Sequence, residues 1–91
     1  MTPDERALTI CDEFRDAVCV LMRRQNRTQE DVAYTAGISP EHLCQMLRGR
    51  ESIKILTICR MADALGYDVK LKLIRKEDRE NDQSRMDRHP Q

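Results

Sequence analysis

The residue types that carry catalytic or metal chemistry are few in this sequence, and they are not grouped. The chain has four cysteines, and none of them forms a C-x-x-C pair. The two histidines, His42 and His89, have no Cys or His at metal-ligand spacing, so a zinc site is not expected. The sequence also contains no nucleophile–base pairing, paired catalytic carboxylates or phosphate-binding glycine loop. It therefore predicts no enzyme, no metal and no cofactor.

Cations are the second group of side chains with a chemical role to consider. Residues 23–54 carry six Lys or Arg and four Asp or Glu, although the whole chain has a formal net charge of zero. The six cations lie towards the two ends of this segment: Arg23, Arg24 and Arg27 near its start, and Arg48, Arg50 and Lys54 near its end. Local charge matters more than total charge for contacts with phosphates. The central segment is therefore the part of the chain best suited to nucleic acid.

Residues 28–49, in the middle of this segment, predict two short helices joined by a tight turn. Thr28 is a predicted N-cap for the first helix, and Gly37 is the predicted turn residue. Ser39 is predicted to cap the second helix, and Pro40 suits its first position because the missing N–H costs nothing there. Two helices joined by a short turn with Gly are typical of a helix-turn-helix.

A long amphipathic helix is predicted before this pair, from residue 4 to about residue 25. Its apolar residues step by four and three, and they are Ala7, Cys11, Phe14, Val18 and Leu21. This spacing places them on one helix face. Charged residues such as Arg15 are expected mostly on the other face, and residues 1–3 are expected to be frayed.

A fourth helix is predicted after the pair, beginning at residues 52–54 and ending at Leu65, with Gly66 beyond its end. Its apolar residues at helical spacing are Ile55, Ile58, Cys59, Ala62 and Leu65. The side chains of Cys11 and Cys59 are expected to be buried, because free cysteines commonly act as small hydrophobes. Tyr34 is expected to pack against the motif or to lie at its rim.

The hydrophobic period changes to two after Gly66, which predicts a half-buried β-strand over residues 67–74. The two faces are Val69, Leu71 and Leu73 on one side and Asp68, Lys70 and Lys72 on the other. The backbone groups of a lone strand need a partner. The simplest partner is the same strand of a second copy, paired antiparallel about a two-fold axis. The alternative is an extended edge segment packed on the chain's own helices.

The last part of the chain, residues 75–91, is a charged tail with one apolar residue, Met86. Such a composition does not bury enough apolar surface to order itself. We therefore expect this tail to be disordered, and the alternatives are a helix near the strand or ordering by a partner. The sequence shows no signal peptide or membrane-spanning run, so a cytoplasmic location without a membrane partner is the default.

The residue types across the two short helices and the fourth helix form a known pattern. Gln, Ala, Gly and an aliphatic residue recur at fixed intervals, here as Gln29, Ala33, Gly37 and Leu43. Residues 49–66 then read GRESIKILTICRMADALG. On these residues, the chain resembles the Cro/C1-type (XRE-like) helix-turn-helix family of phage repressors and bacterial antitoxins. That family commonly has G-x-x-x-P-x-x-x-T-L-x-x-I-A-x-A-L-G at this place, so Ile53 replaces the frequent Pro. The resemblance covers about residues 5–66.

The resemblance implies a mainly α fold, namely a four-helix, lambda-repressor-like helix-turn-helix domain over residues 4–66. The predicted dimerisation strand at 67–74 and the tail at 75–91 follow it. In this family the third helix enters the major groove of double-stranded DNA and contacts base edges with its N-terminal residues.

The resemblance also implies a role for individual residues. By position, Gln29 would contact a phosphate, and Arg48 and Arg50 would hold the DNA backbone. The residues facing the bases would be Ser39, Pro40, Glu41, His42 and Gln45. A Gln can bind adenine through two hydrogen bonds, a Glu can accept one from cytosine, and Pro40 offers only apolar contact.

Three functions remain open on this sequence. The leading one is a homodimeric transcriptional repressor that binds an inverted repeat in double-stranded DNA. The second is an antitoxin that binds a toxin protein and represses its own operon, which the strand and the polar tail favour. The third is a protein-interaction adaptor without DNA binding, which the zero net charge and Glu41 favour.

Overall fold

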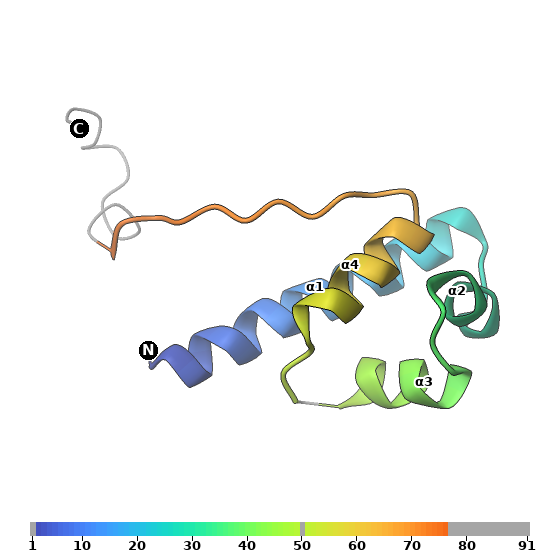
Figure 1. The fold of residues 1–91 in the computed structure, drawn as a ribbon, viewed down its shortest axis with the longest axis horizontal. Coiled ribbons are helices and arrows are strands. Elements are labelled where there is room, and N and C mark those ends of the chain that lie inside the picture. Colours follow the sequence, from blue (N-terminus) through green and yellow to red (C-terminus); the bar gives the residue numbers. More distant parts are fainter. Residues whose placement is uncertain (1, 50, 77–91) are drawn as a thin grey trace.

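Four helices make up the folded part of this chain (Figure 1). The computed structural model describes residues 2–49 and 51–76. Helix α1 spans Pro3–Gln25, α2 spans Gln29–Ala36, α3 spans Pro40–Arg48 and α4 spans Ile55–Ala64. Helix α4 packs against α1 and α2, and α2 also packs against α3. The predicted mainly α fold with four helices is confirmed.

The ends of α1, α2 and α4 are closed by the same backbone arrangement. Each is followed by a residue with positive φ: Asn26 (φ 55°), Gly37 (φ 78°) and Gly66 (φ 88°). The next amide then donates to a carbonyl five residues back. These bonds run from Arg27 to Met22 (2.9 Å), from Ile38 to Ala33 (3.0 Å) and from Tyr67 to Ala62 (2.8 Å). This is the Schellman arrangement, in which Gly is favoured because a positive φ costs it little.

The predicted N-caps of the helix-turn-helix are confirmed. The Thr28 hydroxyl accepts a hydrogen bond from the Asp31 amide at 3.1 Å, and the Ser39 hydroxyl accepts one from the His42 amide at 3.1 Å. Pro40 begins α3. The start of both motif helices is therefore set by side chains next to them in the sequence.

The expectation that the first residues are frayed is wrong for Thr2 and Pro3. The Thr2 hydroxyl accepts from the Glu5 amide at 3.1 Å, and the Thr2 amide donates to the Glu5 carboxylate at 2.9 Å. These two bonds form a capping box, and Pro3 occupies the first helical position. Helix α1 therefore starts one residue before the predicted start.

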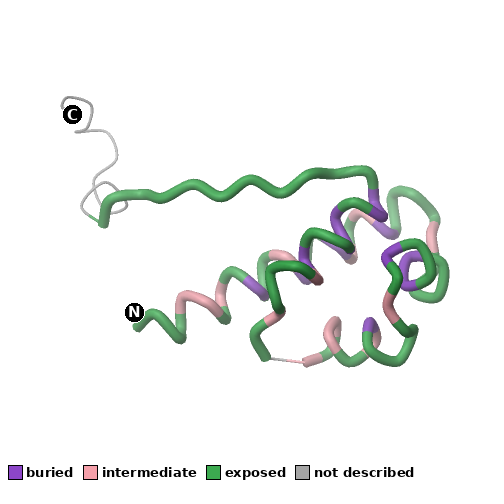
Figure 2. Tube along the Cα trace, in the orientation of Figure 1, coloured by how far each residue is buried: buried purple, intermediate pink, exposed green. Residues whose placement is uncertain are grey.

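The core lies where the four helices meet (Figure 2). Each helix contributes one almost fully buried side chain: Val18 from α1, Val32 from α2, Leu43 from α3 and Met61 from α4. Ala33 is also fully buried, and its small side chain suits the contact of α2 with its neighbours. The core is thus aliphatic, and it ties α3 to the rest of the domain through Leu43.

The predicted buried face of α4 is wrong at two positions. Cys59 is exposed, and Ile55 is 66% exposed. The buried residues are instead the row Ile58, Met61, Ala62 and Leu65, which recur at three, four and seven residues along a helix, together with Ala64. Cys59 follows Ile58 directly, so it lies about 100° around the helix from that row. Cys11, by contrast, is buried as predicted.

Residues 67–75 leave the helices as an extended segment (Figure 1). All of them are exposed, and Leu71 and Leu73 are 85% and 89% exposed. Within the described part of the chain, residues 68–74 make no backbone–backbone hydrogen bond. Leu73 and Ile74 line a hollow of about 340 Å³ together with Pro3 and Arg6 of α1, so the segment lies beside the start of α1 without being buried against it.

The single chain does not form the predicted half-buried β-strand, because residues 68–74 have no backbone partner within the described ranges and none of them is buried. Pairing with a second copy stays a prediction. The predicted disordered tail, residues 75–91, lies outside the described residues except for Arg75 and Lys76.

Candidate nucleic-acid interface

Helix α3 has one face on the core and one face in solvent. Leu43 is fully buried, and Met46 and Leu47 pack against the core cluster. The opposite side consists of Glu41, His42, Gln45 and Arg48, all of which are exposed. Their spacing places these four side chains on one stripe of the helix. Together with Ser39 and Pro40 at the start of the helix, we call them the recognition surface.

The N-terminal residues of the recognition surface also have a structural role. The Ser39 hydroxyl oxygen already accepts the His42 amide as the helix cap, so it offers mainly its O–H to another molecule. Pro40 is exposed at the first helical position. The side chains of Glu41, His42 and Gln45 are therefore the ones most available for contacts with a ligand.

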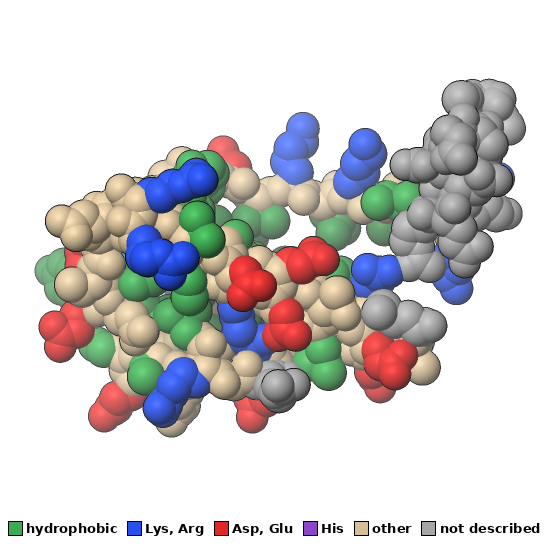
Figure 3. All heavy atoms as spheres, turned by 180° about the vertical axis from the view of Figure 1, so that it is seen from behind, with side chains coloured by type: hydrophobic (Ala, Val, Ile, Leu, Met, Phe, Trp, Pro, Cys, Tyr) green, Lys and Arg blue, Asp and Glu red, His purple; other side chains and the backbone are tan. Residues whose placement is uncertain are grey.

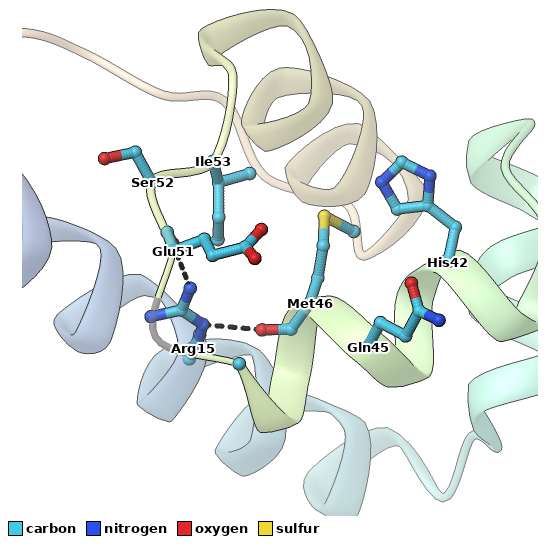
Figure 4. A pocket seen from close by; sticks show the side chains of 8 residues that line it. Arg15, His42, Gln45, Met46, Glu51, Ser52 and Ile53 are labelled. Carbon is cyan, nitrogen blue, oxygen red and sulfur yellow. Dashed lines mark hydrogen bonds between the residues drawn. The ribbon is translucent and has the colours of Figure 1, made fainter.

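A hollow of about 510 Å³ lies beside the recognition surface, between α3 and the loop that follows it (Figure 4). Its lining residues are Arg15, His42, Gln45, Met46, Gly49, Glu51, Ser52 and Ile53. His42 and Gln45 come from α3, and Glu51 points from the loop towards Met46 (Figure 4). The structure thus places His42 and Gln45, two of the predicted base-contacting residues, beside the loop that follows α3.

Gln29 lies at a different hollow, of about 330 Å³, at the start of α2. The other residues that line it are Cys19, Met22, Arg23, Asn26, Arg27 and Leu47. Gln29 is exposed at the first position of α2, where free backbone N–H groups favour an anion. The structure therefore separates this predicted phosphate contact from the His42–Gln45 group. Arg50, the other predicted backbone contact, lies outside the described residues.

Arg27 is tied to the protein by its own contacts. Its Nε donates to the Asp31 carboxylate at 2.8 Å, and a terminal nitrogen donates to the Thr35 hydroxyl at 3.1 Å. The other terminal nitrogen donates to the Ala64 carbonyl at the end of α4. Gln25 binds the neighbouring Leu65 carbonyl at 2.9 Å. Arg27 therefore connects α2 to α4 and is less available to phosphate than the sequence pattern indicated.

The ion pair of Arg27 with Asp31 shifts both pKa values. The hydrogen bond from Arg27 lowers the pKa of the Asp31 carboxyl, and the same bond raises the pKa of Arg27. A carboxyl whose pKa is lower in the folded state than in the unfolded state stabilises the fold above its unfolded pKa. That contribution is lost as the pH falls through the folded pKa.

Replacing Asp31 with Asn is expected to reduce the melting temperature slightly at neutral pH and to have progressively less effect as the pH falls. The reason is that protonated Asp31 no longer forms the ion pair with Arg27. Thermal unfolding followed by circular dichroism over a series of pH values measures this. Glu30→Gln is the matched control, since Glu30 is an exposed acid in the same helical turn. An effect of Asp31→Asn that persisted undiminished into acid would contradict the ion-pair explanation.

The residue that sequence reasoning missed is Arg15. It was expected on the polar face of α1, but it is only 6% exposed. Its Nε donates to the Met46 carbonyl at 2.6 Å, and one terminal nitrogen donates to Asp12 at 2.7 Å. The other terminal nitrogen donates to the Glu51 carbonyl (Figure 4). Arg15 thus fastens the last turn of α3 and the following loop to α1.

A signal for Arg15 was present in the sequence. The buried residues of α1 are Cys11, Arg15, Val18 and Met22, which step by four, three and four along one helix face. Cys11 also contacts the same loop, because its sulfur accepts a hydrogen bond from the Ile53 amide at 3.2 Å. The loop after α3 is therefore held by two residues one turn apart on α1.

A family model described as helix-turn-helix matches residues 21–72, which is more than half of the chain. The chain belongs to the Cro/C1-type (XRE-like) helix-turn-helix family. The matched residues begin near the end of α1 and run through α2, α3 and α4 into the extended segment. No curated protein and no solved structure matched the chain.

Membership of this family implies a DNA-binding transcription regulator whose partner is double-stranded DNA. The family is a regulatory rather than an enzymatic one. Within residues 2–49 and 51–76, no three His, Cys, Asp or Glu side chains gather in a way that could hold a metal ion. In the same ranges, no helix combines the length and the apolar character needed to cross a bilayer.

Proposed function

We propose that this chain is a sequence-specific transcriptional repressor that binds an inverted repeat as a homodimer. The observation that carries the proposal is the recognition surface. Its outward side chains are exposed on a helix that is held in place by Leu43 in the core and by the hydrogen bond from Arg15 of α1 to the Met46 carbonyl. A fixed helix with free polar side chains suits the major groove, whose base edges offer a distinct hydrogen-bond pattern for each base pair.

The recognition surface supplies the donors and acceptors for base contacts. Gln45 suits adenine, with which an amide forms two hydrogen bonds, and Glu41 suits the amino group of cytosine. The His42 ring and the Ser39 hydroxyl can add single hydrogen bonds, and Pro40 offers apolar contact to a thymine methyl.

Gln29, Arg48 and Arg50 are assigned to the phosphates on either side. Contacts with phosphates orient the protein on the duplex and supply much of the affinity, whereas contacts with bases supply the sequence preference. Arg23 lines the same hollow as Gln29, so it adds positive charge where we place a phosphate.

A homodimer is supported by the extended segment at 67–74. The backbone groups of residues 68–74 lack partners within the described chain, and the Val69, Leu71 and Leu73 side chains are exposed. Antiparallel pairing with a second copy would satisfy the backbone groups and cover part of this apolar surface. Two copies of α3 would then face successive major grooves about one helical turn of DNA apart.

Selection of binding sites from random duplex DNA tests the proposal without knowledge of the operator. The expected product is an inverted repeat whose half-site centres are about 10 base pairs apart. Its affinity should fall linearly on a logarithmic scale as salt rises, because phosphate contacts release counterions. Failure to enrich any sequence, or an affinity that does not respond to salt, would support the protein-interaction adaptor instead.

Replacing Leu71 with Asp is expected to weaken the dimer by about a hundredfold or more, because each copy loses the apolar contact that Leu71 would make in the dimer. Sedimentation velocity over a concentration series measures this. Ile55→Asp is the matched control, since Ile55 is also an exposed aliphatic residue but lies on α4. A Leu71→Asp protein that remained dimeric would exclude the segment as the interface, and loss of the dimer only with Ile55→Asp would place the interface on α4.

An antitoxin is the second candidate function, and the same exposed segment favours it. An extended chain with one apolar face can bind a different protein by adding a strand to that protein's sheet. A toxin gene beside the gene for this chain, and capture of its product by residues 67–76, would support this function. Capture that is unchanged after Leu71→Asp would argue against a role for the segment.

A further inference from the structure

We propose that the two extended segments pair in one specific register, with Lys70 on the two-fold axis and Asp68 opposite Lys72 of the second copy. This inference rests on the homodimer proposed above, and it adds how the two copies recognise one another. It follows from the side chains of residues 67–76 and from the two faces that they form.

The extended segment has two chemically different faces. Lys70 and Lys72 alternate with Val69, Leu71 and Leu73, and all five are exposed. Figure 3 shows the Lys side chains of this segment on the side away from the helices and its hydrophobic side chains on the side towards them. A register that covers the apolar face must therefore keep Val69, Leu71 and Leu73 of both copies on one side.

This condition restricts where the two-fold axis can pass. Residues directly opposite in an antiparallel pair point to the same face. An axis between two residues would place Lys opposite Leu and send the apolar residues of the two copies to opposite faces. The axis must therefore pass through a residue, and the central choices are Lys70, Leu71 and Lys72.

Charge then selects among these three registers. With Leu71 on the axis, Lys70 lies opposite Lys72 twice, and like charges directly opposite are destabilising. With Lys72 on the axis, the apolar Val69 lies opposite the charged Arg75. The only opposite-charge pair is then Asp68 with Lys76, and at Lys76 the chain is no longer extended.

The register with Lys70 on the axis has neither defect. It places Asp68 opposite Lys72 twice, Val69 opposite Leu71, and Tyr67 opposite Leu73. Opposite charges and aromatic–aliphatic pairs both stabilise neighbouring strands. Its one like-charge contact is Lys70 with itself. Each copy thereby supplies both partners of the charge pairs, which makes the segment complementary to itself.

A charge exchange within the segment tests the register. In the proposed register, Asp68→Lys and Lys72→Asp each create two like-charge pairs, so each should raise the dimer dissociation constant about tenfold. The double variant Asp68→Lys/Lys72→Asp restores both pairs, and its dissociation constant should return to within about threefold of the original. Sedimentation equilibrium gives the constants, and circular dichroism checks that the helices are unchanged.

The other registers predict different results. With Leu71 on the axis, Lys72→Asp alone would strengthen the dimer, because the new carboxylate would face Lys70 of the second copy. With Lys72 on the axis, Asp68→Lys would weaken the dimer and the double variant would not recover. Either result in a dimeric protein would overturn the register and leave the homodimer standing. A protein that is monomeric at all concentrations would overturn both.

Disulfide cross-linking provides a second test that does not depend on charge. The exposed Cys59 is first replaced by Ser, and a single Cys is then placed at position 70 or 71 by Lys70→Cys or Leu71→Cys. Directly opposite residues have Cα atoms about 4.5–5.5 Å apart, which suits a disulfide, whereas diagonal neighbours are about 7–8 Å apart. Lys70→Cys should therefore cross-link faster. Faster cross-linking by Leu71→Cys would place the axis at Leu71 instead.

Discussion

Replacing Gln45 and Arg48 together with alanine is expected to lower the affinity for a selected operator by about a hundredfold and to leave the fold intact. Both side chains are exposed on α3, so their removal takes nothing from the core. A well-placed pair of hydrogen bonds to a base discriminates by about 1–3 kcal/mol, and a lost phosphate contact weakens binding further. Each ~1.4 kcal/mol corresponds to a factor of ten.

The two single variants separate these contributions. Gln45→Ala should relax the preference at one base pair of each half-site, with little change in salt dependence. Arg48→Ala should weaken binding to all sequences alike and reduce the salt slope by about one per protomer. Electrophoretic shift or fluorescence anisotropy over a salt series measures both quantities.

Arg60→Ala is the matched control for charge, because Arg60 is an exposed cation on α4. It should leave both affinity and specificity unchanged. Operator binding by Gln45→Ala/Arg48→Ala at the affinity of the original protein would remove α3 from the DNA contact and with it the proposed function.

Replacing Arg15 with Met is expected to destabilise the fold by about 3 kcal/mol and to lower the melting temperature by more than about ten degrees. The change keeps a long apolar side chain but leaves the carbonyls of Met46 and Glu51 without their donor. A lost hydrogen bond to a charged group costs about 1.5–3 kcal/mol, and each ~1 kcal/mol corresponds to about 4–8 °C in a domain of this size. Thermal and urea unfolding measure the change.

The conservative variant Arg15→Lys separates the effect of the positive charge from that of the guanidinium hydrogen bonds. Arg15→Lys keeps the positive charge but not the planar fork that reaches three acceptors at once, so its stability should lie between those of the original protein and Arg15→Met. Arg24→Met is the control, since Arg24 is an exposed Arg on the same helix. A melting temperature of Arg15→Met equal to that of the Arg24→Met control would show that the buried contacts contribute nothing.

The parts of the fold that were predictable from the sequence are those set by neighbouring residues. The caps at Thr28 and Ser39 and the closures at Gly37 and Gly66 each involve bonds that span five residues or fewer. Their physics is local, so residue type and spacing were enough to find them. The outward stripe of α3 followed in the same way from helical periodicity.

The features that were missed depend on distant parts of the chain. Arg15 binds carbonyls 31 and 36 residues away; its spacing from Cys11, Val18 and Met22 indicates the buried face, but its two distant partners follow only from the packing of α1 on the loop. The buried face of α4 was misjudged, since Cys59 lies outside the row that faces the core, and Ile55, although at the right spacing, is exposed at the first residue of the helix. The predicted strand at 67–74 has no backbone partner within the described chain, and its pairing with a second copy stays a prediction.

In helix α3, the residues that hold the helix in place differ from those that face outward, and this bears on how such regulators diversify. Leu43 and the Met46 carbonyl hold the helix in place, whereas Glu41, His42 and Gln45 face outward. Under the proposed function, substitutions at the outward positions would change the preferred operator with little effect on stability. After gene duplication, a copy of such a protein could therefore acquire a new promoter preference through a few substitutions at exposed positions, while its core stays unchanged.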